Sequence, residues 1–190
     1  MRDSFPALAR RVSDDLGQTH RYAHVVRVAR LADLLAQAHG IDPRKARLAG
    51  MLHDLARPFN RQRLITECTV RRMPIDDFEA ANPIVLHARL SAALANERYG
   101  VGDPEVLSAI EKHTVAAAAM SPLDCILYLA DGLEPGRDFP ERAELARLAR
   151  VDLGAAMRET LVFNLRYLQA QGLAAAPQTL QAARTFGAAE

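Results

Sequence analysis

Tryptophan is absent from this 190-residue sequence, and aromatic residues of all kinds make up only 5% of it. Proteins that bind single-stranded nucleic acid use an aromatic platform for base stacking and a basic groove for the backbone. A formal net charge of +1 provides no such basic surface. We therefore expect no nucleic-acid partner. Any anionic substrate must be held by local cations, such as metal ions or a few arginines.

Cysteine is also scarce, because Cys68 and Cys125 are the two present and they lie far apart. Two isolated cysteines make neither a disulfide framework nor a thiolate metal motif, which is typical of a reducing compartment. The opening residues lack the apolar run of a signal peptide, and no stretch approaches the roughly 18 apolar residues of a membrane span. The sequence accordingly predicts a cytoplasmic protein without membrane association.

Signals for β-strands are sparse as well, since β-branched residues are few and no Asn-Gly or Asp-Gly hairpin occurs. Alanine, leucine and arginine dominate, with apolar positions at helical spacing. Asp42, Asp103 and Ser121 each precede a proline, the combination that begins many helices. These patterns predict an all-α protein. The expected helices span residues 4–16, 20–38, 43–56, 61–67, 84–99, 104–112, 122–132, 140–149, 152–171 and 177–185.

No internal repeat or linker divides the chain, so residues 1–190 are expected to form a single helical-bundle domain. Its core would span about 18–140, with the helices of 140–185 packing on it. Those last helices could instead form a homodimer interface, and the sequence leaves this open. The irregular segment 57–82 could form a lid, a wall of a site or a structural connection.

Six polar side chains lie at the ends of otherwise apolar helical segments: His24, His53, Asp54, His87, His113 and Asp131. Taken alone, each could be an ordinary core or surface residue, and Asp54, for example, could pair with Arg57. The sequence has two further histidines. His39 fits a cation at a helix C-terminus, and His20 could pair with His24, four residues away, as a competing ligand pair. Together, the six suggest helix ends that converge on one interior site.

Imidazole and carboxylate without thiolate suit iron, manganese, zinc or magnesium rather than a structural zinc site. Four imidazoles and two carboxylates are enough for two divalent ions, and the two oxygens of Asp54 could bridge them. Two such ions would activate water and clamp a phosphate oxygen. The residues themselves therefore predict metal-dependent hydrolysis of a phosphate ester or anhydride.

The order of these residues resembles the HD-domain phosphohydrolases that carry additional histidines, and in particular the YqeK-type symmetrical bis(5′-nucleosyl)-tetraphosphatases. The resemblance covers roughly residues 18–185. It rests on these strings: His20-Arg21-Tyr22-x-His24, His53-Asp54-x-Ala56, Asn82-Pro83-x-x-x-His87-Ala88, Ala109-Ile110-x-x-His113-Thr114 and Ala130-Asp131-x-x-Glu134-Pro135-x-Arg137-x-Phe139-Pro140. The His-Asp doublet alone is weak evidence, whereas the last string in register with the others is specific.

The resemblance implies an all-helical enzyme that splits diadenosine tetraphosphate into two ADP with two metal ions, iron being preferred to manganese, magnesium or zinc. One ion would be held by His24, His53, Asp54 and Asp131. The second would be held by His87 and His113, with Asp54 as the bridge. Asp54 and Arg57 would be catalytic. Contacts with the substrate would come from Arg21, Arg57, His87, Thr114 and Arg137.

Two positions depart from the family pattern. Arg57 stands where the family usually has lysine, and arginine keeps the charge but cannot lose a proton to act as a base. The alanine-rich segment 115–120 replaces a turn that commonly contains glycine, so we expect this segment to be more helical.

Two other functions remain open at this point. One is a different HD-domain nucleotide phosphohydrolase, such as a nucleoside monophosphatase. The other is a metal-binding module without activity that associates with another protein. The complete set of six potential ligands favours the enzyme.

Overall fold

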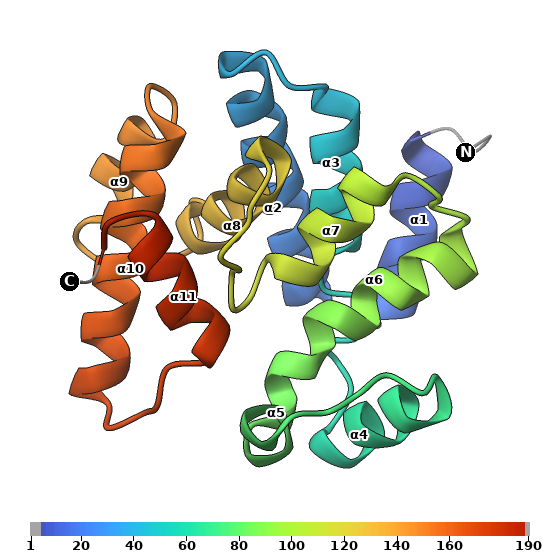
Figure 1. Ribbon diagram of the computed structural model, residues 1–190. Coiled ribbons are helices and arrows are strands. Elements are labelled where there is room, and N and C mark those ends of the chain that lie inside the picture. Colours follow the sequence, from blue (N-terminus) through green and yellow to red (C-terminus); the bar gives the residue numbers. More distant parts are fainter. Residues whose placement is uncertain (1–4, 189–190) are drawn as a thin grey trace.

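A computed structural model describes residues 5–188, and the regular structure of this part is entirely helical, as the sequence predicts (Figure 1). The elements in chain order are α1 (Phe5–Leu16), α2 (Thr19–Ala38), α3 (Pro43–Leu52), α4 (Arg61–Val70), α5 (Asp77–Ala81), the 3₁₀ helix η1 (Pro83–Val85), α6 (Leu86–Tyr99), α7 (Pro104–Lys112), α8 (Pro122–Leu133), α9 (Arg142–Leu148), α10 (Leu153–Ala170) and α11 (Pro177–Thr185). Residue 4, where the first helix was expected to begin, lies outside the described residues.

The predicted starts of three helices are confirmed. The Asp42 carboxylate accepts a hydrogen bond from the amide of Arg44 at the start of α3. Asp103 does the same for Glu105 at α7. Ser121 and Asp124 form a reciprocal capping box at α8. In each case the capping residue precedes a proline at the first helical position, where a missing N–H costs nothing.

α3 ends at Leu52, four residues before the end expected at residue 56. The amide of Ala56 does not continue the helix, because it donates to the buried hydroxyl of Ser91 on α6, at 3.0 Å. Residues 53–59 form successive turns instead, with the amide of Arg57 bonded to the carbonyl of Asp54 at 2.9 Å. The His-Asp doublet therefore stands just beyond the end of the helix.

The short helix α5 was not expected from the sequence. Its start is a capping box in which Asp76 and Glu79 each accept the other's backbone amide. An acidic or hydroxyl residue followed three positions later by glutamate signals this arrangement, so Asp76 and Glu79 could have revealed it. The expected helix 84–99 is also divided, because Pro83–Val85 form a 3₁₀ turn before α6 begins at Leu86.

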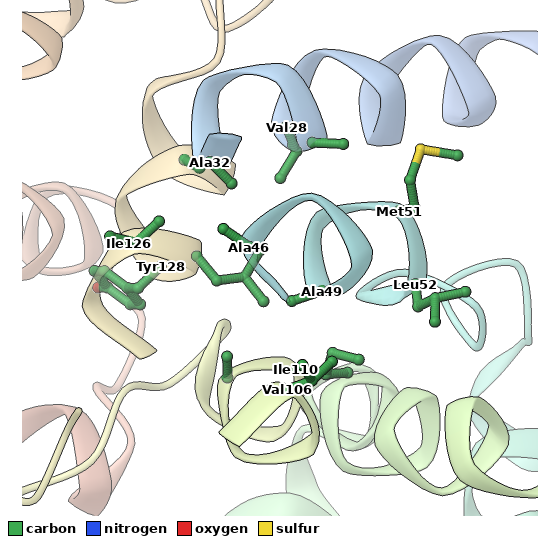
Figure 2. Packing of buried hydrophobic residues seen from close by; sticks show 14 of the residues in the cluster. Val28, Ala32, Ala46, Ala49, Met51, Leu52, Val106, Ile110, Ile126 and Tyr128 are labelled. Atoms are coloured by element: carbon green, nitrogen blue, oxygen red, sulfur yellow. The ribbon is translucent and has the colours of Figure 1, made fainter. Parts of the chain in front are cut away.

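The core is built around α3, which lies between α2 and α7 in Figure 2, with α8 beside it. α2 and α3 pack very closely at Gly50. A Cβ atom at this position would lie 2.6 Å from the Cα atom of Ala29 on α2. Only glycine permits this approach of the two backbones, which brings residues of α2 near the end of α3.

The last three helices lie together on one side of the molecule (Figure 1) and contact the rest mainly through α8. Asn164 on α10 donates to the hydroxyl of Tyr128 on α8 at 2.8 Å. Thr179 on α11 donates to the carbonyl of Val115 at 2.8 Å, which anchors the segment after His113. Within residues 5–188, no helix combines the length and apolar character needed to cross a bilayer.

The expectation that segment 115–120 is helical is wrong. No residue from 115 to 120 is helical, and Ala116 has a φ of 60°. This left-handed conformation is the one that glycine adopts without strain. The chain therefore turns at this segment, with alanine in a conformation that favours glycine.

Substitutions at Ala116 should reveal this strain. Ala116→Gly is expected to change the free energy of unfolding by less than about 1 kcal/mol, because relief of the left-handed strain offsets the buried methyl group that is lost. Ala116→Val is expected to destabilise by about 2 kcal/mol, since a β-branched residue at positive φ is strained and the site is only 2% exposed. Urea denaturation measures both changes. Equal stability of the glycine and valine variants would contradict this interpretation.

Candidate metal centre

The structure brings all six predicted ligands together where helix ends meet. His24 comes from α2, and His53 and Asp54 follow directly after α3. His87 is the second residue of α6, His113 follows α7, and Asp131 lies near the end of α8. The residues span 108 positions of sequence, from 24 to 131, so no local spacing could have joined them.

The carboxylate of Asp54 stands between two pairs of imidazoles. Its Oδ2 lies 3.9 Å from Nε2 of both His24 and His53. Its Oδ1 lies 3.3 Å from Nε2 of His87 and 3.9 Å from Nε2 of His113. Each oxygen of one carboxylate therefore faces its own pair of histidines.

Asp131 lies on the His24 side of this arrangement. Its Oδ1 is 3.1 Å from Nε2 of His24 and 3.8 Å from Nε2 of His53. The donor atoms form two overlapping groups within 4.8 Å, one of His24, His53 and Asp131, the other of His53, Asp54 and His113. On the opposite side, Nε2 of His87 and Nε2 of His113 are 3.2 Å apart.

His53 provides a test of whether a cation fits here. The side chain is fully buried, and its Nδ1 donates to the carbonyl oxygen of Gly50 at 2.8 Å. Its Nε2 therefore carries a lone pair, and this buried atom has no hydrogen-bond partner. The nearest charged atoms are carboxylate oxygens, which also have lone pairs. A cation among them would satisfy all of these atoms, so the residues fit a metal.

The protonation states of His113, Asp131 and Asp54 also suit metal ligands. Burial, together with neighbouring imidazoles, lowers the pKa of His113 to about 3, so this imidazole stays neutral. Burial would raise the pKa of Asp131, but the hydrogen bond with His24 outweighs it and holds that pKa well below the usual range. Nearby imidazoles likewise lower the pKa of Asp54 against the effect of burial. Neutral imidazoles and ionised carboxylates are the forms that bind metal.

A cavity of about 470 Å³ opens onto four of the six ligands: His24, Asp54, His87 and Asp131. Its walls also contain four arginines: Arg21, Arg27, Arg57 and Arg137. Arg137 donates to Oδ1 of Asp131 at 2.6 Å, and Arg21 donates to Gln18 at 2.9 Å. Within the described residues, no hydrogen bond or ion pair engages the guanidinium of Arg57. That group remains available for an anion.

Thr114 and His20 line the same cavity. The Thr114 hydroxyl lies 3.2 Å from Nε2 of His87 and 3.1 Å from Nε2 of His113. His20 is exposed, and neither group of donor atoms includes it. His39 lies elsewhere, capping α2 and bonded to the carbonyl of Ala149 at 2.7 Å.

Two residues of the site, Glu134 and Arg27, were not predicted from the sequence. Glu134 is 1% exposed, and its Oε1 lies 3.1 Å from Nδ1 of His24. Burial would raise the pKa of Glu134, but the hydrogen bonds from Arg27, the Gly136 amide and His24 lower it to about 2, so the carboxylate is ionised. Its place in the Ala-Asp-x-x-Glu-Pro string was the only available signal.

Comparison with known proteins gives the class of this protein. The HD-domain family model matches residues 21–136, the segment that carries all six predicted ligands. The chain therefore belongs to the HD-domain family of hydrolases, which depend on metal ions, and the resemblance inferred from the motifs is confirmed.

Similarity to individual proteins narrows the comparison from the whole family to particular relatives. The chain is 32% identical to the protein named symmetrical bis(5′-nucleosyl)-tetraphosphatase of Bacillus subtilis (strain 168), over 84% of this chain and 86% of that protein. It is 34% identical to the protein of the same name from Halalkalibacterium halodurans, over 85% and 86%. A crystal structure from Clostridium acetobutylicum, described as a predicted HD superfamily hydrolase involved in NAD metabolism, superposes with a TM-score of 0.92 at 32% identity and 97% coverage of both chains.

Proposed function

We propose that this chain hydrolyses dinucleoside tetraphosphates symmetrically, with diadenosine tetraphosphate as the substrate and two molecules of ADP as products. The observation that carries the proposal is the position of Asp54, whose two oxygens face separate pairs of histidines beside an arginine-lined cavity. The names of the two bacterial relatives support the substrate.

In this proposal His24, His53, Asp54 and Asp131 would hold one divalent ion, and His87 and His113, together with Asp54, would hold a second. Iron is the preferred metal. Bound there, two divalent ions supply an activated water and neutralise charge on the phosphate oxygens. The neutral imidazole of His113 and the ionised carboxylates require no change of protonation before they bind a cation.

The arginines act on the substrate. Arg21, Arg57 and Arg137 line the cavity and offer planar donor groups to the polyphosphate chain. With the polyphosphate held by these arginines, water would attack one of the two phosphorus atoms of the central anhydride. The bond from that phosphorus to the bridging oxygen breaks, the bridging oxygen leaves with the other half, and each product is a nucleoside diphosphate.

We also propose that the helices beyond residue 140 belong to the same domain as the site. Thr179 on α11 bonds to Val115, which directly follows Thr114. The C-terminal helices thus support the segment that carries one wall of the cavity.

Product analysis tests the proposal. Protein purified without oxygen and loaded with Fe²⁺ or Mn²⁺ is incubated with diadenosine tetraphosphate, and the nucleotides are separated by chromatography. ADP as the sole product supports symmetrical hydrolysis, whereas AMP together with ATP contradicts it. A parallel incubation uses AMP as the substrate. Release of inorganic phosphate from AMP, without reaction of the tetraphosphate, favours a nucleoside monophosphatase.

Arg57 is expected to bind the polyphosphate. Arg57→Ala should lower kcat/KM by about 10–100-fold, the value of one lost hydrogen bond to a charged group. Arg57→Lys keeps the charge and should retain most of the activity. Arg30→Ala removes an exposed arginine of α2 and serves as the matched control. Steady-state kinetics of the three variants decide the matter, and an Arg57→Ala variant as active as Arg30→Ala would exclude this role.

A further inference from the structure

The four histidines of the centre are held in two different ways. Three of them bond through Nδ1 to a carbonyl oxygen three residues earlier in the chain: His53 to Gly50 at 2.8 Å, His87 to Ile84 at 2.5 Å and His113 to Ile110 at 2.7 Å. Each of these histidines lies at a helix end or start, where the local turn allows the contact. A short-range hydrogen bond thus directs each Nε2 toward Asp54.

His24 cannot use this local arrangement. It lies within α2, where the preceding carbonyls are already engaged in the helix. Its Nδ1 instead donates to Oε1 of Glu134 at 3.1 Å, a residue 110 positions away. The ionised carboxylate of Glu134 accepts in this pair, so Nδ1 carries a proton, and Nε2, which faces Oδ1 of Asp131 at 3.1 Å, is the nitrogen left to bind a metal.

Glu134 is itself firmly held. Arg27 donates to both carboxylate oxygens, from Nε at 2.5 Å and from Nη2 at 3.1 Å, and the Gly136 amide donates at 2.5 Å. Arg27 lies three residues after His24, on the same face of α2. A Cβ atom at Gly136 would lie 2.5 Å from Nη2 of Arg27, so a glycine is needed there for Arg27 to stay in place.

We propose that Glu134 is a positioning residue for the metal centre, which fixes the orientation and tautomer of His24 and is held by Arg27 and Gly136. Asp131 and Glu134 are three residues apart at the end of α8 and contact opposite nitrogens of the same imidazole, each at 3.1 Å. Nε2 of His24 is thereby directed at Asp131 and Asp54. Carboxylate partners of this kind raise the basicity of a ligating histidine.

The inference rests on the proposed metal site but not on the proposed substrate, so metal binding by itself can test it. Isothermal titration of metal-free protein with Mn²⁺ is compared for the wild type, Glu134→Ala, Glu134→Gln and Gly136→Ala. Glu144→Gln, at an exposed position of α9, is the matched control. Glu134→Ala is expected to weaken the ion held by His24 by about 10–100-fold and to leave the second ion unaffected.

The other variants separate positioning from simple stabilisation. Glu134→Gln keeps an oxygen that can accept from His24 and should lose less affinity than Glu134→Ala. Gly136→Ala displaces only the flexible end of Arg27, so it should fold normally and still weaken the same ion. Thermal melting of the metal-free proteins shows whether each variant folds. If Glu134→Ala does not fold, the Mn²⁺ affinity of Gly136→Ala tests the inference in its place.

Two results would overturn the inference. One is Mn²⁺ affinity within twofold of the wild type in folded Glu134→Ala and Gly136→Ala proteins. The other is a wild-type protein that binds no Mn²⁺. A wild type that does not hydrolyse diadenosine tetraphosphate but shows the expected order of Mn²⁺ affinities would refute the proposed substrate and support the role of Glu134.

Discussion

An Asp54→Asn variant is expected to lose at least about 10³-fold in kcat and to bind divalent metal far more weakly at both positions. Each Asp54 oxygen faces a separate pair of histidines, so one substitution affects both proposed ions. Metal ions supply several kcal/mol of transition-state stabilisation, which corresponds to a factor of this size. Metal analysis of the purified variant, combined with single-turnover kinetics, measures both effects.

The substitution is close to isosteric, so the variant should fold. Circular dichroism and thermal melting of the metal-free protein check this. Asp14→Asn changes an exposed aspartate of α1 in the same way and should keep wild-type metal content and activity. Full metal content in active Asp54→Asn protein would refute the bridging role of Asp54.

A Gly50→Ala variant is expected to lose at least about 3 kcal/mol of folding free energy, at the upper end of the range for an overpacked core. The added Cβ would lie 2.6 Å from Cα and 2.9 Å from the backbone nitrogen of Ala29. Neither atom can move unless α2 shifts as a whole. For a chain of this size the midpoint of thermal unfolding should fall by about 6–12 °C.

The same shift would affect the metal centre, because α2 carries His24 and the Gly50 carbonyl accepts from His53. Weaker Mn²⁺ binding should therefore accompany the lower stability. Gly132→Ala is the matched control, since a Cβ at this helical position of α8 meets nothing within 4 Å. It should stabilise the protein by about 0.5–1 kcal/mol. An unchanged melting temperature for Gly50→Ala would show that α2 and α3 tolerate a wider separation.

Several features followed from the sequence because they depend on neighbours in the chain. The starts of α3, α7 and α8 are set by side chains that bond to amides two or three residues ahead, so Asp42, Asp103 and Ser121 predicted them. The capping box of α5 is equally local and could have been predicted from Asp76 and Glu79. The end of α3 could not, because the amide of Ala56 bonds to Ser91, 35 residues away.

The features of the metal centre likewise depend partly on the sequence and partly on the tertiary structure. The sequence by itself determined which residue types stand at helix ends, and it determined the local bonds from His53, His87 and His113 to carbonyls three positions earlier. Only the tertiary structure decided how the two oxygens of Asp54 are shared between histidine pairs. It also decided that Glu134 supports His24 across 110 residues. Spacing in sequence encodes contacts within a helical turn, whereas contacts between helices depend on packing, here on the close approach of α2 and α3 at Gly50.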